Sequence, residues 1–178
     1  EEVLRYLFGK EACEADISVI EGAMGYYDGI AGVETRASAY DVARVTDTPV
    51  ILIVNTKGMS LSSVAVIKGF LEFKKDHRIA GVILNRMSES LYSRVKGQIE
   101  SELQVKVLGY VPKIEEYVIE SRHLGLVTPD EVENLQEKLH GLADILEKTI
   151  DLDEIIRIAE GTSDFQYEVP RLPKLLQP

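Results

Sequence analysis

Two carboxylates in one short stretch of the chain could do chemistry together. Glu21 directly follows an apolar run at residues 17–20, and Asp28 follows a turn of small residues that contains Gly22 and Gly25. If the run is a buried parallel strand, Glu21 lies at its carboxyl end, where α/β sheets bind ligands. Glycines let backbone approach a phosphate or substrate closely. We therefore take Glu21 and Asp28 as candidate catalytic residues; alternatively, Glu21 faces solvent and Asp28 belongs to an ordinary turn.

Elements that would position these residues follow from the apolar spacing, which switches between strand and helix periods along the chain. That alternation is typical of an α/β fold with a parallel sheet covered by helices. Four parallel strands are predicted, at residues 17–20, 50–54, 79–84 and 107–111. Helices are predicted around residues 3–8, 35–47, 64–71, 91–103, 135–146 and 155–158.

The end of the chain carries helical signals and then prolines. Residues 128–131, Thr-Pro-Asp-Glu, form a capping box at a helix start. Four leucines then predict the buried stripe of a long helix: Leu135, Leu139, Leu142 and Leu146. From Thr162 the chain is polar, contains three prolines and has little left to bury. We therefore expect a domain over residues 1–161 and a linker over residues 162–178.

Composition excludes several classes of protein. The 178 residues are 45% hydrophobic and 28% charged, enough to bury one core. With 30 acidic and 20 basic residues the net charge is -10, so the basic face of a nucleic-acid binder is not evident. The apolar runs are far shorter than the roughly 20 residues that span a bilayer. A single cysteine, Cys13, allows no internal disulfide, and we expect a cytoplasmic protein without membrane contact.

The stretch around the two carboxylates also resembles a known motif. Residues 21–29, Glu-Gly-Ala-Met-Gly-Tyr-Tyr-Asp-Gly, closely resemble the E-G-x-M-G-x-Y-D-G motif of cobyrinate a,c-diamide synthases, glutamine-dependent amidotransferases of corrinoid biosynthesis. Further similar segments follow in the order of that family: Ser38 with residues 41–43, then residues 49–54, 57–60, 80–86, 108–112 and 122–127. In series these segments are specific, and they cover residues 16–127.

This resemblance implies an ATP-dependent ligase built on a P-loop NTPase-like, dethiobiotin-synthetase-like domain. Such an enzyme amidates the a- and c-carboxylates of cobyrinate, or of a related tetrapyrrole, through an acyl phosphate. Activation is needed because ammonia cannot displace hydroxide directly, and phosphoryl transfer depends on positioning and charge neutralisation. ATP and Mg²⁺ are the implied cofactors, with Glu21 as the oxygen ligand of the metal. Asp28 would position the substrate or ammonia.

Other matched residues acquire roles only through the resemblance. Gly22 and Gly25 would keep the turn beside the nucleotide open. The amide of Asn85, next to Arg86, would contact the adenine edge, although Asn85 could instead cap the following helix. Pro112 would shape the loop on the other side of the base.

Three matched residues would lie on the tetrapyrrole side: Tyr27, Ser38 and His123. A histidine in a loop is more often a hydrogen-bonded structural residue, so this alternative stays open for His123. Lys57 would meet a phosphate or an acidic substrate, or would simply be solvated.

Two parts of the family are absent from this sequence. It contains no G-x-x-x-x-G-K-[ST] phosphate loop and no glutaminase domain with a nucleophilic cysteine. We therefore interpret the chain as the later part of a synthetase domain that receives glutamine-derived ammonia from a glutaminase domain lying elsewhere. The sheet edge left without its neighbouring strand could pair with a second copy, giving a homodimer.

Three positions depart from the family pattern and keep other functions open. Ala39, Tyr40 and Asn55 stand where the family more often has threonine, alanine and aspartate. These departures put the identity of the tetrapyrrole in doubt, so a nickel-sirohydrochlorin a,c-diamide synthase is an alternative. A dethiobiotin-synthetase-like ligase is another, and a partitioning-type ATPase that acts as a binding module is a third. The acidic charge argues against the last.

Overall fold

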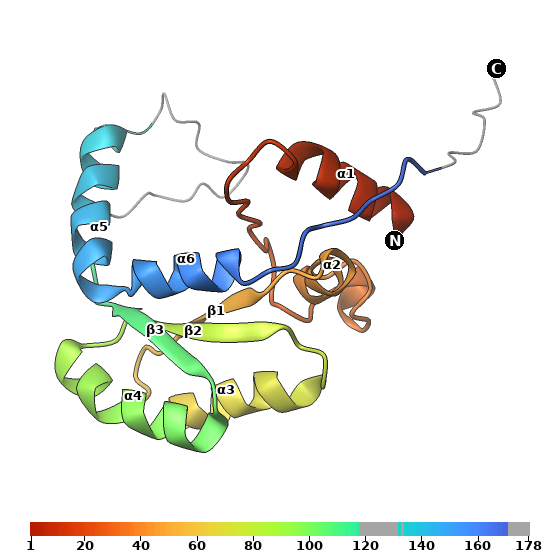
Figure 1. Cartoon of the computed structure of the whole chain (residues 1–178). Coiled ribbons are helices and arrows are strands. Elements are labelled where there is room, and N and C mark those ends of the chain that lie inside the picture. The colour runs from red at the N-terminus through yellow and green to blue at the C-terminus, as the bar shows by residue number, and fades with distance from the viewer. Residues whose placement is uncertain (118–131, 133, 171–178) are drawn as a thin grey trace. The chain divides into compact units, whose positions relative to one another are not determined.

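The computed structural model describes residues 1–117, 132 and 134–170. Its elements, labelled in Figure 1, fall into two compact units. Unit 1 comprises residues 1–50, 73–78 and 156–178, and unit 2 comprises residues 51–72 and 79–155. The two groups of candidate residues are divided between these units.

A three-stranded sheet forms the centre of unit 2, in the order β1 (Val50–Asn55), β2 (Ile79–Asn85) and β3 (Lys106–Val111). β2 and β3 run parallel, with Gly81 opposite Lys106 and Asn85 opposite Val111. Three of the four predicted strands are therefore confirmed, and the expected α/β class with a parallel sheet is confirmed with them.

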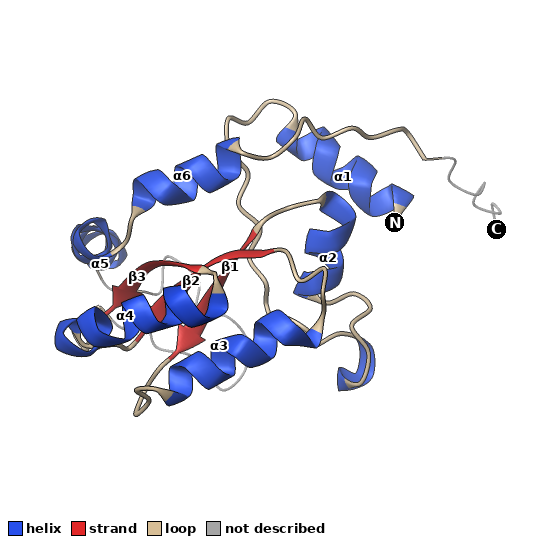
Figure 2. Ribbon diagram, turned by 60° about the horizontal axis from the view of Figure 1, so that its bottom comes forward, coloured by secondary structure: helices blue, strands red, loops and turns tan. Residues whose placement is uncertain are grey.

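Helices α3 (Ser62–Phe73) and α4 (Glu89–Leu103) cover one face of this sheet (Figure 2). The apolar positions of α4 recur every fourth residue, and Val95 and Ile99 on that stripe are buried. Four apolar side chains of unit 2 have no exposed surface: Ile67, Val82, Leu84 and Ile99. The helical spacing in the sequence thus identified the core of this unit.

α5 (Leu135–Thr149) lies against the edge strand β3, where Gly109 and Ile150 form an antiparallel bridge. The prediction of a buried leucine stripe is wrong, since no residue of α5 is buried and Leu139 is 44% exposed. Within the described residues, Leu135, Leu142 and Leu146 are half-buried. The capping box predicted at residues 128–131 lies outside the described residues.

Unit 1 is mainly helical. α1 (Glu2–Ala12) packs on α2 (Ala39–Thr46), and the 3₁₀ helix η1 (Ile30–Gly32) lies in the loop before α2. α6 (Leu152–Glu160) begins in unit 2 and ends in unit 1. Each of these α-helices was predicted from its spacing.

The predicted strand at residues 17–20 is wrong. These residues form an irregular segment in which Val19 is 91% exposed and Ile17 and Ile20 are each 45% exposed. No backbone hydrogen bond joins residues 16–24 to any other described residue. A strand needs a neighbouring strand that forms hydrogen bonds with its N–H and carbonyl groups. This run has no such neighbour within the described part of the chain.

Residues 163–169 have no regular secondary structure, but they lie along α1 within unit 1 (Figure 1). Phe165 packs edge-to-face on Phe8, with ring centroids 5.0 Å apart. The Arg5 guanidinium lies 4.4 Å from the Phe165 ring centroid and donates to the Gln166 carbonyl at 2.7 Å. The prediction that this segment has little to bury holds except at Phe165, which is half-buried, and a linker beginning at residue 162 stays a prediction.

Candidate functional site

The turn at residues 21–29 is fixed to the start of α2. Gly22 faces Ala39 so closely that a β-carbon at Gly22 would lie 2.9 Å from the β-carbon of Ala39. The backbone N–H of Tyr40 donates to the Tyr26 carbonyl at 2.9 Å. These two contacts join the turn to the first turn of α2.

The start of α2 is itself held by a reciprocal cap. Ser38 is the N-cap residue, and its hydroxyl accepts from the Asp41 N–H at 3.2 Å and donates to the Thr35 carbonyl at 2.6 Å. Asp41 in turn accepts from the Ala37 N–H at 2.9 Å. The Ser38 side chain, predicted to contact substrate, is thus buried and already engaged in capping.

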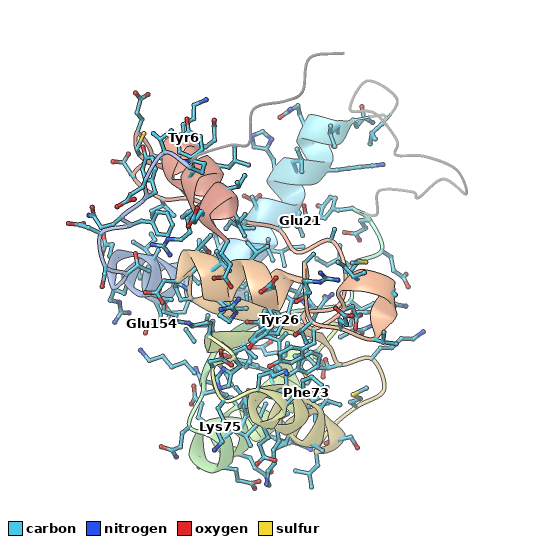
Figure 3. The ribbon with its side chains drawn as sticks, turned by 90° about the vertical axis from the view of Figure 1, so that its right-hand side faces the viewer. Tyr6, Glu21, Tyr26, Phe73, Lys75 and Glu154 are labelled. Carbon is cyan, nitrogen blue, oxygen red and sulfur yellow. The ribbon has the colours of Figure 1, made fainter. Side chains whose placement is uncertain are left out.

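Aromatic side chains pack behind the turn. The Tyr27 ring lies 4.7 Å from Tyr26, 5.3 Å from Tyr40 and 4.9 Å from Phe73, measured between centroids. Figure 3 labels Tyr26 and Phe73 of this cluster. The Tyr26 hydroxyl donates to the His77 carbonyl, and the Tyr40 hydroxyl donates to Asp76 at 2.8 Å. Burial raises the pKa of Tyr27 to about 12, so the phenol stays neutral near pH 7.

This cluster explains one departure from the family pattern. Tyr40, which stands where the family more often has alanine, is only 6% exposed. Its ring fills space between α2 and residues 73–78 instead of projecting into solvent. The added phenol is part of the core of unit 1, which weakens the argument that it alters the substrate.

The two candidate carboxylates are exposed beside this turn. The Asp28 carboxylate lies directly over Gly25, where a β-carbon would overlap it. Glu21 stands at the end of the irregular segment. Neither side chain makes a hydrogen bond or an ion pair within the described residues. Both can therefore take an external ligand without first losing a partner.

Gly29 closes the loop that carries Asp28. Its N–H donates to the Glu34 carbonyl at 2.9 Å, and the next N–H, of Ile30, donates to the Arg36 carbonyl at 3.0 Å. A β-carbon at Gly29 would clash with both carbonyl oxygens. This glycine is required by the close backbone approach.

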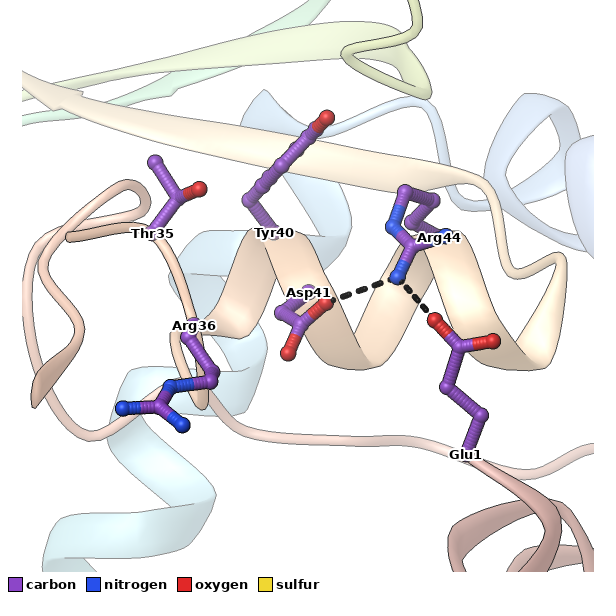
Figure 4. A pocket seen from close by; sticks show the side chains of 6 residues that line it. All are labelled: Glu1, Thr35, Arg36, Tyr40, Asp41 and Arg44. Carbon is purple, nitrogen blue, oxygen red and sulfur yellow. Dashed lines mark hydrogen bonds and ion pairs between the residues drawn. The ribbon is translucent and has the colours of Figure 1, made fainter.

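A separate hollow of about 440 Å³ lies beside α2 (Figure 4). It is lined by Glu1, Thr35, Arg36, Tyr40, Asp41 and Arg44. The Arg44 guanidinium bridges Glu1 at 2.5 Å and Asp41 at 3.1 Å, so its charge is already paired. Neither Glu21 nor Asp28 lines this hollow, and it is not the candidate site.

The residues expected around the nucleotide base meet in unit 2. Asn85 ends β2 opposite Val111, which directly precedes Pro112, and Arg86 follows in a left-handed conformation with φ of 62°. The Asn85 amide is half-buried and makes no hydrogen bond within the described residues. Ser88 occupies the N-cap of α4, so the alternative that Asn85 caps this helix is wrong.

The end of β1 contributes to the same edge of the sheet. Asn55 accepts the Lys57 N–H at 3.2 Å, which gives this departure from the family pattern a local turn-forming role. The Lys57 side chain is exposed. The sequence analysis missed Thr56, which is buried and donates a hydrogen bond to the backbone of Asn85. A threonine directly after an apolar strand could have indicated this role.

The structure therefore brings Glu21, Gly22, Gly25, Tyr27, Asp28 and Ser38 together in unit 1, and Asn85, Arg86 and Pro112 together in unit 2. His123 lies outside the described residues.

Within the part of the chain that the structure describes, no three His, Cys, Asp or Glu side chains form a metal cluster. Mg²⁺ bound with a nucleotide needs only one or two carboxylates besides phosphate oxygens, and an unpartnered Glu21 fits that requirement. None of the described helices is long and apolar enough to cross a bilayer.

Comparison with known proteins gives consistent results. A family model described as an AAA domain matches residues 3–121. Proteins named cobyrinate a,c-diamide synthase are similar to most of the chain: one from Listeria innocua is 42% identical over 92% of this chain and 36% of its own length. One from Caldanaerobacter subterraneus is 41% identical over 98% and 38%, and one from Methanocaldococcus jannaschii is 39% identical over 93% and 37%. The chain thus spans little more than a third of these curated relatives. No solved structure matches it.

Proposed function

This chain belongs to the AAA domain family, a P-loop NTPase-like family, and on that premise we propose that it serves an ATP-dependent ligase. The proposed reaction is the amidation of the a- and c-carboxylates of cobyrinate or a related tetrapyrrole. The observation that carries the proposal is the turn at residues 21–29, where two exposed carboxylates make no hydrogen bond or ion pair within the described residues and the Tyr26 carbonyl is bonded to the start of α2. The names of relatives about 40% identical to the chain support the choice of substrate.

The two carboxylates of this chain would have different roles, one at the metal and one at the substrate. When bound, Mg·ATP supplies the phosphoryl group that converts a carboxylate to an acyl phosphate. Glu21 offers the hard oxygen ligand that Mg²⁺ prefers. Asp28, which lies over Gly25, would position the substrate or ammonia.

On the nucleotide side, the Asn85 amide offers both a donor and an acceptor, as the adenine edge requires. Arg86 and Pro112 flank it. Tyr27, Ser38 and His123 are proposed for the tetrapyrrole side; the burial of Ser38 and the packing of Tyr27 favour indirect roles for these two. We further propose a cytoplasmic location, ammonia supply by a glutaminase domain, and pairing of two copies.

The experiment that tests the metal role uses the full-length protein that the gene encodes. Glu21→Gln is expected to lower turnover of cobyrinate with ATP, Mg²⁺ and glutamine by orders of magnitude, with an unchanged melting temperature. The matched control is Glu14→Gln, an exposed acid nearby that should leave turnover unchanged. Activity of Glu21→Gln within about tenfold of wild type would contradict the proposal.

Asp28 is tested by separating ATP binding from product formation. Asp28→Asn should leave the dissociation constant for Mg·ATP nearly unchanged while amide formation falls strongly. Calorimetry and a product assay on one sample decide this. A large loss of ATP affinity would instead assign Asp28 to the nucleotide side.

The 178-residue chain alone is expected to be inactive and to bind Mg·ATP weakly. Most phosphate affinity in such folds comes from the backbone amides and lysine of a phosphate loop, which this sequence does not contain. Titration with ATP and Mg²⁺ tests this expectation, and a dissociation constant in the low micromolar range would overturn it.

A further inference from the structure

The backbone of Asn85 is held by one buried threonine. Both the N–H and the hydroxyl of Thr56 donate to the Asn85 carbonyl oxygen, each at 2.8 Å. A carbonyl oxygen has two lone pairs, so Thr56 alone satisfies it. Thr56 is 1% exposed, and water cannot replace its hydroxyl.

The other side of Asn85 is fixed as well. The N–H of Met87 donates to the Val111 carbonyl at 3.1 Å, and Val111 lies opposite Asn85 in the sheet. Between these two points Arg86 adopts a φ of 62°, a conformation that costs a residue with a side chain about 1 kcal/mol. The ends of β1 and β3 therefore determine the backbone of Asn85 from both sides.

The side chain of Asn85 is the part that remains available. It is half-buried and makes no hydrogen bond within the described residues, although its own backbone is fully engaged. A rigid backbone beneath an unengaged amide restricts the directions in which that amide can point. This is the arrangement that preorganised recognition needs.

We propose that Thr56 is a positioning residue for the nucleotide base: through its two hydrogen bonds it aims the Asn85 amide at the 6-amino edge of adenine. The inference rests on the proposed function, in which Asn85 contacts adenine. Thr56 itself touches no ligand. Its hydroxyl acts on binding only through the carbonyl of Asn85.

The test compares ATP with purine riboside 5′-triphosphate, which is ATP without its 6-amino group, in the full-length protein. The ratio of the two dissociation constants measures what the 6-amino contact contributes. Asn85→Ala is expected to bring this ratio to within about twofold of unity. Thr56→Val should reduce the ratio by about threefold or more, the size expected for one neutral hydrogen bond.

Two further variants separate positioning from stability. Thr56→Ser keeps the hydroxyl and should restore the wild-type ratio. Thr46→Val removes another buried threonine hydroxyl, one that donates to the Val42 carbonyl at 2.8 Å in α2. It should lower the melting temperature and leave the ratio unchanged. If Thr56→Val does not fold, Thr56→Ala provides the same comparison.

Failure of the two proposals would look different. If Asn85→Ala leaves the ratio unchanged, the adenine contact in the proposed function is wrong. If Asn85→Ala abolishes the preference while Thr56→Val and Thr56→Ala keep it at the wild-type value, the positioning role of Thr56 is wrong. A reduced ratio in Thr46→Val as well would assign the effect to general destabilisation and would also overturn the inference.

Discussion

Residues 17–20 and residues 79–84 are both apolar runs that end in a polar residue, yet only the second is a strand. In β2, Leu84 has no exposed surface, because β1 and β3 flank the strand and α3 and α4 cover a face of the sheet. In the first run Val19 is 91% exposed. The comparison shows that an apolar run forms a strand only where a neighbouring strand forms hydrogen bonds with its backbone N–H and carbonyl groups.

The same difference separates the two groups of candidate residues. Asn85 stands on a backbone fixed from two sides, whereas Glu21 ends a segment without backbone hydrogen bonds to described residues. The backbone of the residue that we propose to contact the base is thus fixed within unit 2. A rigid position for Glu21 would require a further partner for the segment that precedes it.

Hydrogen exchange should show the largest contrast between the two runs. In the 178-residue chain, amides of β2 are expected to exchange only through global unfolding, whereas amides of residues 16–24 should exchange almost as in an unfolded peptide. Protection factors from NMR or mass spectrometry measure this. Comparable protection in both runs would mean that residues 17–20 pair with a second copy, which dilution would reveal.

Truncation of one side chain in each run should give the next largest contrast. Leu84→Ala should cost about 2–5 kcal/mol of unfolding free energy because it opens a cavity in a closed core. Val19→Ala should change it by less than about 0.5 kcal/mol. Urea denaturation of the same chain measures both. Similar losses would show that Val19 is covered in solution.

Two glycines should respond with opposite signs. Gly29→Ala should destabilise the protein by about 1–3 kcal/mol, because the new methyl meets two backbone carbonyls that cannot move aside. Gly97→Ala, in α4 with nothing within 4 Å of the added carbon, should stabilise it by up to about 1 kcal/mol. The midpoints of urea denaturation decide. A neutral Gly29→Ala would mean that the loop around Asp28 is not held as the structure shows.

The smallest expected effect is the pH dependence of the stability that the hydrogen bond between Tyr40 and Asp76 contributes. The hydrogen bond from Tyr40 holds the pKa of Asp76 below its ordinary value of 3.8. A lowered pKa stabilises the folded state above the ordinary value, and this contribution is lost as the pH falls through the folded value. The difference in melting temperature between wild type and Tyr40→Phe should therefore be present at pH 7 and shrink below pH 3.8. A difference independent of pH would assign the effect to ring packing alone.

Sequence patterns predicted the elements whose burial is decided locally. The runs at residues 50–54, 79–84 and 107–111 are strands because each has a paired neighbour and a covered face. Periodicity alone could not show that residues 17–20 lack such a neighbour, or that α5 contacts mainly an edge strand. The spacing of the four leucines predicts which face of α5 is apolar, but it does not predict which part of the chain packs on that face.

The candidate site was predictable to a similar degree. The expectation that Gly22 and Gly25 let backbone approach a ligand stays a prediction, and the structure shows close contacts within the chain instead, with the Asp28 carboxylate at Gly25 and two backbone carbonyls at Gly29. Ser38 was predicted only to contact the tetrapyrrole, and its capping role was missed although Asp41 follows it at the spacing of a capping box. Thr56 was not predictable in the same way, because its two hydrogen bonds depend on how the ends of β1 and β2 align.

The contact between α1 and residues 163–169 can form only after nearly the whole described chain has been synthesised. Arg5 and Gln166 are 161 positions apart, so at cellular rates of about 5–20 residues per second, roughly ten to thirty seconds separate their synthesis. Throughout that interval the Phe8 ring lacks its Phe165 partner. α1 is made early but can reach its final packing only late, and until then its aromatic side chains lack the partners that residues 163–169 provide.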